Sequence, residues 1–157
     1  GNKLEQAVIY DPSRNDLFCA TKGRGAYMND RRIRVAKRNS LRECLISTGF
    51  PFRPGDAFQT YMQMLGDVMP KCAGVRRPGS AALDLAYVAA GFSDGFFEMG
   101  LSPWDVAAGV LLITEAGGKL TGVDGGPLNI DQPELLAASS PQLHAQMLDV
   151  LRRADGL

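Results

Sequence analysis

The chain has 157 residues, of which 45% are hydrophobic and 22% are charged. This composition is typical of a soluble globular domain, and a chain of this length buries roughly 70% of the surface that it exposes when unfolded. The 17 basic residues balance the 17 acidic residues, so no net field draws the chain to nucleic acid or to a membrane surface. Composition therefore predicts one domain and identifies no partner.

The cysteines are Cys19, Cys44 and Cys72, and the chain has one histidine, His144. This wide spacing fits neither a zinc site nor a disulfide framework, so we expect ordinary buried or half-buried thiols. We find no signal peptide and no apolar run near the roughly 18 residues of a membrane span, which predicts a cytoplasmic protein without a membrane partner. A strand-like pattern follows Gly1 almost at once, which indicates a start inside a larger protein.

The first third of the chain predicts strands. Apolar segments at Leu4–Tyr10 and Asp16–Thr21 flank the turn-forming cluster Asp11–Asn15, a pattern typical of an antiparallel hairpin. Short strands are predicted near Ile33–Val35 and at Cys44–Thr48. The opening of the chain is therefore expected to be a meander.

A loop rich in proline and glycine, Gly49–Gly55, precedes the first predicted helix, Asp56–Met69. Asp56 is suited to cap this helix and Pro70 to end it. The methionines of the helix are expected to fill the core. Apolar residues at helical spacing define its predicted buried face: Phe58, Met62, Leu65, Val68 and Met69.

The rest of the chain alternates between strands and helices, which predicts an α/β (mixed α+β) fold in layers, with a mixed sheet covered by helices. Ser80 is expected to cap one helix, which ends at Gly91, and Asp105 to cap another. The predicted strands are near Val75 and at Phe96–Met99, Lys119–Val123 and Leu135–Ala138, and the predicted helices are Ala81–Ala90, Val106–Ala116 and Pro141–Arg153.

The segment around Asp105 indicates a ligand site. A carboxylate there lies at the amino end of a helix whose first turn is built from small residues, and helix amino ends favour anions. A phosphate group fits beside Asp105 only if a cation offsets the charge, which points to a hard divalent ion such as magnesium. The simpler alternative is that Asp105 is only an N-cap and Trp104 only a core residue.

Two segments carry a family resemblance. Trp104–Gly109 reads W-D-V-A-A-G and Glu115–Gly118 reads E-A-G-G. Together they resemble the carboxyl-terminal signature of the inositol monophosphatase family, whose members have a layered sugar-phosphatase fold. The resemblance implies that Asp105 is a catalytic residue that binds Mg²⁺ and lies against the hydroxyl groups of the substrate.

A second block, Pro78–Gly91 with Asp94–Glu98, resembles the G-[ST]-A-A helix of the same family and the strand that follows it. The resemblance implies that the backbone of Gly79, Ser80 and Ala81 donates hydrogen bonds to the inositol ring and that Glu98 accepts them. The alternatives are that Ser80 is only a helix cap and that Glu98 is an exposed acid at a strand end.

The resemblance covers nearly all of the chain but lacks the remaining metal ligands of the family. These lie upstream, in a glutamate-containing helix and a D-P-[IL]-D-G-T segment; Asp11–Asn15 begins like that segment but lacks its second aspartate, glycine and threonine. We therefore predict that residues 1–157 are the carboxyl-terminal portion of an inositol monophosphatase-like domain, without its amino-terminal metal-binding half, and are inactive or nearly inactive alone.

For the complete protein, the resemblance implies Mg²⁺-dependent hydrolysis of inositol 1-phosphate by metal-activated water, and a homodimer. A related sugar or nucleotide phosphatase activity is an alternative. The resemblance is strongest to the SuhB-like bacterial branch, which is associated with transcription antitermination factors, so an interaction module is a second hypothesis. Arg76-Arg77 and Arg31-Arg32 with Arg34 are its candidate basic patches, although solvated arginines or a dimer interface explain them more simply.

Overall fold

The computed structural model describes residues 3–51 and 57–154, which form two sheets and four helices. A four-stranded antiparallel sheet has the order β1-β2-β3-β4, and a five-stranded mixed sheet has the order β6-β5-β7-β9-β8. The predicted mixed α/β class is confirmed, while the opening meander forms a sheet of its own. The strands are β1 (Gln6–Asp11), β2 (Asp16–Thr21), β3 (Gly25–Met28), β4 (Arg31–Ile33), β5 (Leu45–Thr48), β6 (Gly74–Arg76), β7 (Gly95–Glu98), β8 (Lys119–Gly122) and β9 (Leu135–Ala138).

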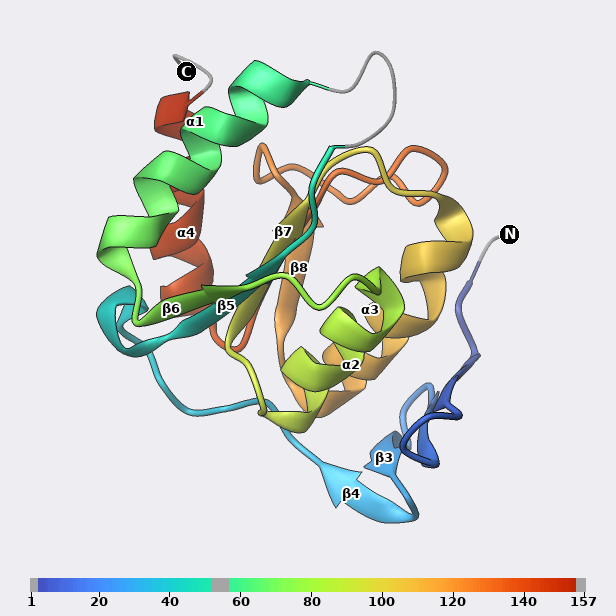
Figure 1. The fold of residues 1–157 in the computed structure, drawn as a ribbon. Coiled ribbons are helices and arrows are strands. Elements are labelled where there is room, and N and C mark those ends of the chain that lie inside the picture. The colour runs from blue at the N-terminus through green and yellow to red at the C-terminus, as the bar shows by residue number, and fades with distance from the viewer. Residues whose placement is uncertain (1–2, 52–56, 155–157) are drawn as a thin grey trace.

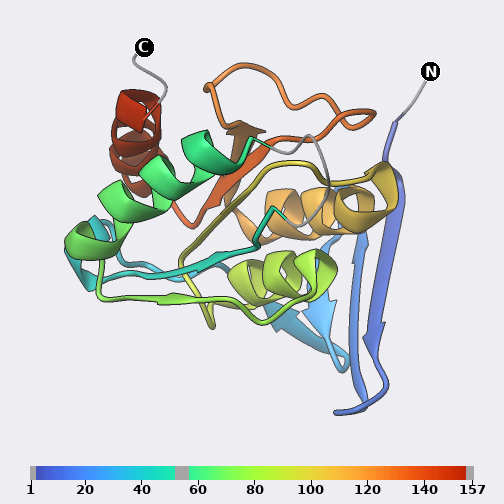
Figure 2. The same ribbon diagram turned by 45° about the horizontal axis from the view of Figure 1, so that its top comes forward.

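One pair of helices lies between the two sheets, and a second pair covers the outer face of the mixed sheet. α2 (Ala81–Ala90) and α3 (Pro103–Ala116) pack against each other and lie between the two sheets, as Figure 2 shows. α1 (Phe58–Val68) and α4 (Pro141–Ala154) lie side by side on the other face of the mixed sheet (Figure 1). The order of layers is therefore sheet, helices, sheet, helices, with one apolar core on each side of the mixed sheet.

The first hairpin confirms the predicted turn. β1 and β2 pair in antiparallel register from Gln6 opposite Thr21 to Asp11 opposite Asp16. The backbone N–H and the hydroxyl of Ser13 both donate to Oδ1 of Asp11, at 2.9 and 2.6 Å, which closes the turn. The structure also adds β3, which was not predicted, and places β4 two residues earlier than expected.

The predicted caps of α2 are confirmed. The Ser80 hydroxyl accepts a hydrogen bond from the Leu83 backbone N–H at 3.4 Å, and Gly91 ends the helix with a left-handed φ of 81°. The predicted cap of α3 is wrong, because Ser102 is the N-cap and Pro103 the first helical residue. Asp105 is the third residue of the helix, and its carboxylate accepts a hydrogen bond from the backbone N–H of the cap residue Ser102. Both Ser102 and Asp105 are residue types that cap helices, so the sequence alone does not decide which of them is the cap.

The predicted buried face of α1 is largely wrong. Phe58, Met62 and Met69 are exposed, whereas Tyr61 and Met64 are buried. The helix begins one residue after Ala57, and Asp56, the predicted cap, lies outside the described residues. Apolar residues lie on both faces of α1, so their spacing alone did not identify the side that packs against α4.

The last turn of α3 connects the helix to the antiparallel sheet. Oε1 of Glu115 accepts a hydrogen bond from the Gly25 backbone N–H at 2.9 Å, across 90 residues of sequence. The backbone N–H groups of Gly25 and Gly23 hold the pKa of Glu115 below its ordinary value. Further up the helix, a Cβ at Gly109 would overlap with the side chain of Leu85, so glycine permits the close packing of α3 on α2.

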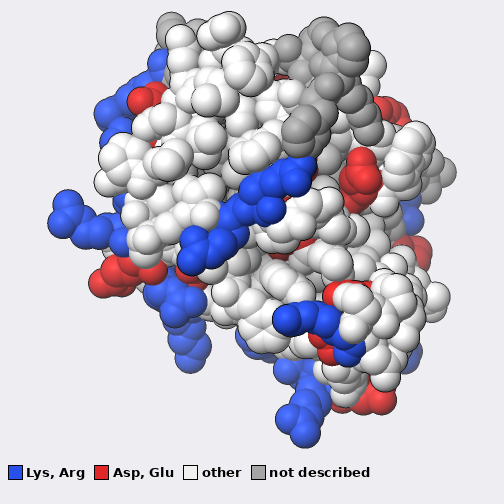
Figure 3. All heavy atoms as spheres, in the orientation of Figure 1, with Lys and Arg blue, Asp and Glu red and all other residues white. Residues whose placement is uncertain are grey.

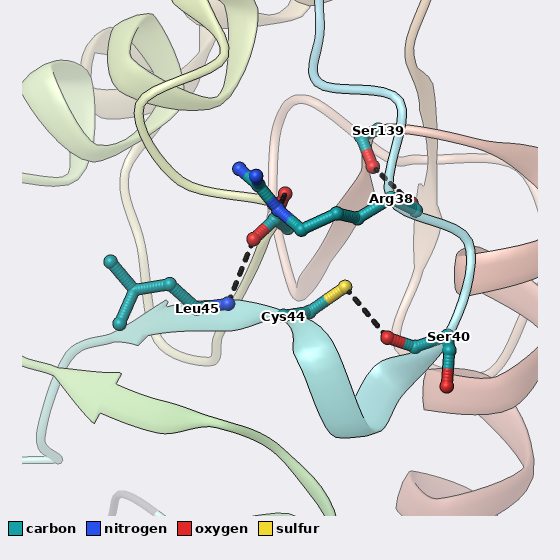
Figure 4. Close-up of polar contacts among 6 residues, drawn as sticks. Arg38, Ser40, Cys44, Leu45 and Ser139 are labelled. Atoms are coloured by element: carbon teal, nitrogen blue, oxygen red, sulfur yellow. Dashed lines mark hydrogen bonds and ion pairs between the residues drawn. The ribbon is translucent and has the colours of Figure 1, made fainter.

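The amino ends of β5 and β7 are joined through the buried carboxylate of Asp94, which also forms an ion pair with the half-exposed Arg38. Asp94, which directly precedes β7, accepts hydrogen bonds from Arg38 Nε at 2.9 Å and from the Leu45 backbone N–H at 2.8 Å. Figure 4 shows Arg38 and Leu45 converging there, with Ser139 beside the Arg38 backbone. This end of the mixed sheet is held by polar contacts within the chain.

The thiols lie as predicted, with Cys44 buried, Cys19 and Cys72 half-buried, and all three unpaired. Burial raises the pKa of the Cys44 thiol to about 12, so this group stays protonated at neutral pH. Among residues 3–51 and 57–154, no helix has the length and apolar character that crossing a bilayer requires.

Candidate active site

A cavity of about 360 Å³ opens at the carboxyl ends of three neighbouring strands. β5 pairs in parallel with both β6 and β7, so the residues that follow all three strands emerge at the same edge of the sheet. This edge is where open α/β sheets bind ligands. The cavity is lined by Gly49, Phe50, Arg77, Gly79, Ser80, Ala81, Ala82, Asp84, Glu98, Met99, Gly100, Leu101 and Asp105.

The structure brings every predicted site residue into this cavity. Gly79, Ser80 and Ala81 lie at the amino end of α2, Glu98 ends β7, and Asp105 lies in the first turn of α3. The amino end of α2 therefore opens on the cavity with backbone N–H groups that lack partners within the helix, and α3 adds the Asp105 side chain from its first turn. Such an arrangement favours an anion or the oxygens of a sugar.

Asp105 is held by its own helix. Its Oδ2 accepts a hydrogen bond from the Ser102 backbone N–H at 2.9 Å, and its backbone N–H donates to the Ser102 carbonyl at 3.0 Å. The capping bond uses one carboxylate oxygen, which leaves Oδ1 as the oxygen suited to a cation. The alternative that Trp104 is a core residue is wrong, because 79% of its surface is exposed.

Glu98 lies directly against the backbone of β5. A Cβ built on Gly49 would overlap with the Glu98 carboxyl group, so the absence of a side chain at Gly49 makes room for it. Thr48, the last residue of β5, connects this strand to β7 and α1: its hydroxyl lies 2.9 Å from the Phe97 carbonyl and 3.0 Å from the Tyr61 hydroxyl. Glu98 is therefore a half-buried acid on a braced strand end, and the alternative of an exposed acid is wrong.

The candidate basic residues lie at two places in the fold. Arg77 lines the cavity, and its guanidinium group lies 5.1 Å from the centre of the Phe50 ring, a cation–π distance. Arg31 and Arg32 belong to β4 in the other sheet, so they form a group separate from Arg76 and Arg77 in the fold. Figure 3 shows a short run of basic side chains across the middle of one face, with the others dispersed among acidic residues.

Sequence reasoning missed Asp84. This residue lies in the first turn of α2, is 2% exposed and lines the cavity, and its Oδ1 has no hydrogen-bond partner among the described residues. Burial, followed by the charge of Glu98, raises the pKa of Asp84 to about 7, while Arg77 opposes the shift. An aspartate between two leucines in the sequence was the available signal.

Asp105 fits as one ligand of a magnesium ion. Mg²⁺ prefers six oxygen ligands and usually keeps several waters, so one carboxylate is a common protein contribution. The described residues contain no group of three or more His, Cys, Asp or Glu side chains that could hold a metal ion. The described chain therefore does not complete a multi-ligand site by itself.

Comparisons with known proteins identify the family of the chain. The model of the inositol monophosphatase family matches residues 2–155. The protein named Nus factor SuhB from Salmonella typhimurium is 47% identical over 150 residues, which are 96% of this chain and 56% of that protein. The inositol-1-monophosphatase of Caulobacter vibrioides is 45% identical over 155 residues, 98% of this chain and 60% of that protein.

Solved structures match in the same way. The extragenic suppressor protein suhB from Bartonella henselae has a TM-score of 0.88 at 44% identity, covering 95% of this chain and 57% of that one. The inositol monophosphatase of Anabaena has a TM-score of 0.83 at 40% identity, covering 93% and 57%. The chain spans just over half the length of these relatives. By sequence and by fold, the chain belongs to the inositol monophosphatase family.

Proposed function

We propose that this chain forms the sugar-binding side of a Mg²⁺-dependent phosphatase that hydrolyses inositol 1-phosphate to inositol and phosphate. The observation that carries the proposal is the meeting of Asp105, Glu98 and the amino end of α2 at one cavity. The name of the Caulobacter relative supports the same substrate class. A related sugar or nucleotide phosphate remains the alternative substrate.

The residues of the cavity contact different parts of the substrate and its metal ion. The backbone N–H groups at Gly79, Ser80 and Ala81 donate to substrate oxygens, and the Glu98 carboxylate accepts from ring hydroxyls. Asp105 holds a cation close to the phosphate ester through its free carboxylate oxygen. When bound, Mg²⁺ lowers the pKa of a coordinated water and offsets charge on the phosphoryl group. Fixed orientation of the alcohol contributes several kcal/mol to lowering the barrier.

The activity requires residues beyond this chain, because the chain covers 56% of the Salmonella relative and offers one metal ligand at the cavity. The test compares these 157 residues with a protein that also carries the additional upstream sequence, called the extended protein below. Phosphate release from inositol 1-phosphate with Mg²⁺ is expected from the extended protein and not from the 157 residues alone. Equal activity in both would contradict the assignment of the missing ligands.

A second function, as a partner of transcription antitermination factors, is favoured by relatives at 44% to 47% identity that are named Nus factor SuhB. The exposed Arg76 and the β4 arginines Arg31 and Arg32 are its candidate contacts. Pull-down of transcription elongation factors by the extended protein, with and without Asp105→Asn, separates the two functions. Retained binding without catalysis would support an independent partner role, and absence of binding would remove it.

A homodimer and a cytoplasmic location also belong to this proposal. Light scattering of the extended protein after size-exclusion chromatography measures the first, and a mass of one protomer would contradict it. Fractionation of cells that produce the protein measures the second.

A further inference from the structure

Asp84 lines the cavity, but the proposed function does not use it and no hydrogen bond within the described residues accounts for its buried Oδ1. It lies on α2 between the buried Leu85 and the half-buried Leu83, with 2% of its surface exposed. Of the buried side-chain oxygens in the described part of the chain, Asp84 Oδ1 and Ser93 Oγ lack hydrogen-bond partners. Ser93 does not line the cavity, and Asp84 does.

A buried carboxyl group without a partner destabilises the folded state. Leaving a buried polar atom unpaired costs stability, and the cost is larger when the group is charged. Burial relieves part of this cost by raising the pKa of Asp84 to about 7, so the group is close to half protonated at neutral pH. A protonated carboxyl group donates one hydrogen bond and accepts others, which an ionised one does not.

Hydrogen-bond donors and acceptors both line the cavity around Asp84, as the binding of a polyol requires. Backbone N–H donors of α2 and the acceptor oxygens of Glu98 line the same cavity as Asp84. Each hydroxyl of a cyclic polyol is both a donor and an acceptor. A neutral acid at the cavity wall satisfies such a hydroxyl without adding a further full negative charge near a phosphate ester.

We propose that Asp84 is a further substrate-positioning residue, whose buried carboxyl group forms a hydrogen bond with a ring hydroxyl of the polyol phosphate in the cavity. This inference rests on the proposed function and adds a specificity-determining residue to it. Oδ1 is enclosed in the free protein, so the carboxyl group turns toward the ring hydroxyl when the substrate binds.

The test replaces Asp84 in the extended protein and compares two substrates, inositol 1-phosphate and p-nitrophenyl phosphate. The p-nitrophenyl group has no free hydroxyl, so it cannot form the proposed hydrogen bond with Asp84. Asp84→Leu is expected to raise KM for inositol 1-phosphate about tenfold with little change in kcat, because a ground-state contact is lost. KM for p-nitrophenyl phosphate is expected to change less than about twofold. Asp84→Asn, which keeps the shape and the hydrogen bond, is expected to restore KM to within about threefold of the original.

Ser93→Ala is the matched control, because it removes the other unpaired buried oxygen at a position outside the cavity. It is expected to leave both KM values unchanged. An unchanged KM for inositol 1-phosphate in folded Asp84→Leu would overturn the inference, and so would an equal rise for both esters. If Asp84→Leu does not fold, Asp84→Ala carries the same expectation.

Failure of the proposed function gives a different result. If the unaltered extended protein releases phosphate from neither ester, the proposed function is wrong whatever Asp84 does. Calorimetric titration with inositol 1-phosphate then tests Asp84 independently of turnover. Weaker binding to Asp84→Leu than to the unaltered protein would support its role, and an equal Kd would overturn it.

Discussion

A buried aspartate lies near each end of the strands of the mixed sheet. Asp94 directly precedes β7 and Asp84 lies on α2 at the cavity, and the two differ in their hydrogen-bond partners. At the amino ends of β5 and β7, Asp94 is 1% exposed and accepts hydrogen bonds from Arg38 and the Leu45 backbone. At the carboxyl ends, Asp84 is 2% exposed and its Oδ1 has no partner among the described residues. Burial is the same, but one acid is satisfied by the protein and the other is not.

This difference indicates that the amino edge of the sheet serves the stability of the fold and the carboxyl edge serves ligand binding. An acid that is fully paired within the chain stabilises the fold and leaves no capacity for a ligand. An unpaired buried acid costs stability, and a fold tolerates this cost most readily where a ligand compensates for it. The carboxyl edge of the sheet, with Asp84, Glu98 and Asp105, is the edge where α/β proteins bind ligands.

The largest expected effect is on catalysis at the carboxyl edge. Asp105→Asn in the extended protein is expected to lower phosphate release from inositol 1-phosphate at least about 100-fold, because an amide is a poor ligand for Mg²⁺. The asparagine carbonyl still accepts from the Ser102 backbone, so the melting temperature is expected to change by less than about 3 °C. A loss of activity that tracks a loss of folded protein would contradict this separation.

The next effect concerns the amino edge. Asp94→Leu leaves the Leu45 N–H without its acceptor, removes the ion pair with the half-exposed Arg38, and is expected to lower the free energy of unfolding by about 3 kcal/mol. Thermal unfolding measures this as a fall of roughly 10 °C. The matched variant Asp84→Leu removes an unpaired group and is expected not to destabilise the protein. Equal destabilisation by both would remove the distinction between the two aspartates.

Asp84 also predicts a pH dependence of stability. Its pKa is 3.8 in a model peptide and about 7 in the fold, so the folded protein keeps a proton that the unfolded chain loses. The stabilisation is complete below about pH 3.8 and is lost as pH rises through about 7. From pH 5 to pH 7 this loss is roughly 2 kcal/mol.

Denaturant titrations at pH 5 and pH 7 measure the effect as the difference between the unaltered protein and Asp84→Asn. The asparagine variant does not titrate at this position, so its stability is expected to fall less over the same range. Parallel pH profiles for the two proteins would show that Asp84 is ionised in the fold.

A smaller effect is expected at Gly49. Gly49→Ala pushes the Glu98 carboxyl group out of its position and is expected to raise KM for inositol 1-phosphate about fivefold. Gly66→Ala is the control, because a Cβ there contacts nothing within 4 Å. It replaces glycine inside α1 and is expected to stabilise the protein by up to about 1 kcal/mol without changing KM. Equal KM values in the two variants would contradict the role of Gly49.

Local signals in the sequence predicted much of the fold. The hydroxyl of Ser80 and the left-handed Gly91 define both ends of α2 through interactions within a few residues. The hairpin at Asp11 is local in the same sense. The two errors at helices arise from competing local signals, since Ser102 and Asp105 both suit a cap and α1 has apolar residues on two faces.

The candidate site was predicted from resemblance and completed by topology. Asp105, Glu98 and the start of α2 carry motif residues, and the structure places all of them at one cavity. Gly49 and Asp84 received no role from the sequence, because each depends on Glu98, which lies 49 and 14 residues further along the chain, respectively. Their environment follows from the pairing of β5 with β7, which the sequence does not specify locally.

The position of a bound metal tests the account most directly. Crystals of the extended protein grown with Mn²⁺ and inositol 1-phosphate are expected to show anomalous density about 2.2 Å from a carboxylate oxygen of Asp105, with the ring against Glu98 and the start of α2. Anomalous density confined to other carboxylates, with the Asp105 oxygens and the cavity empty of metal and ester, would contradict it.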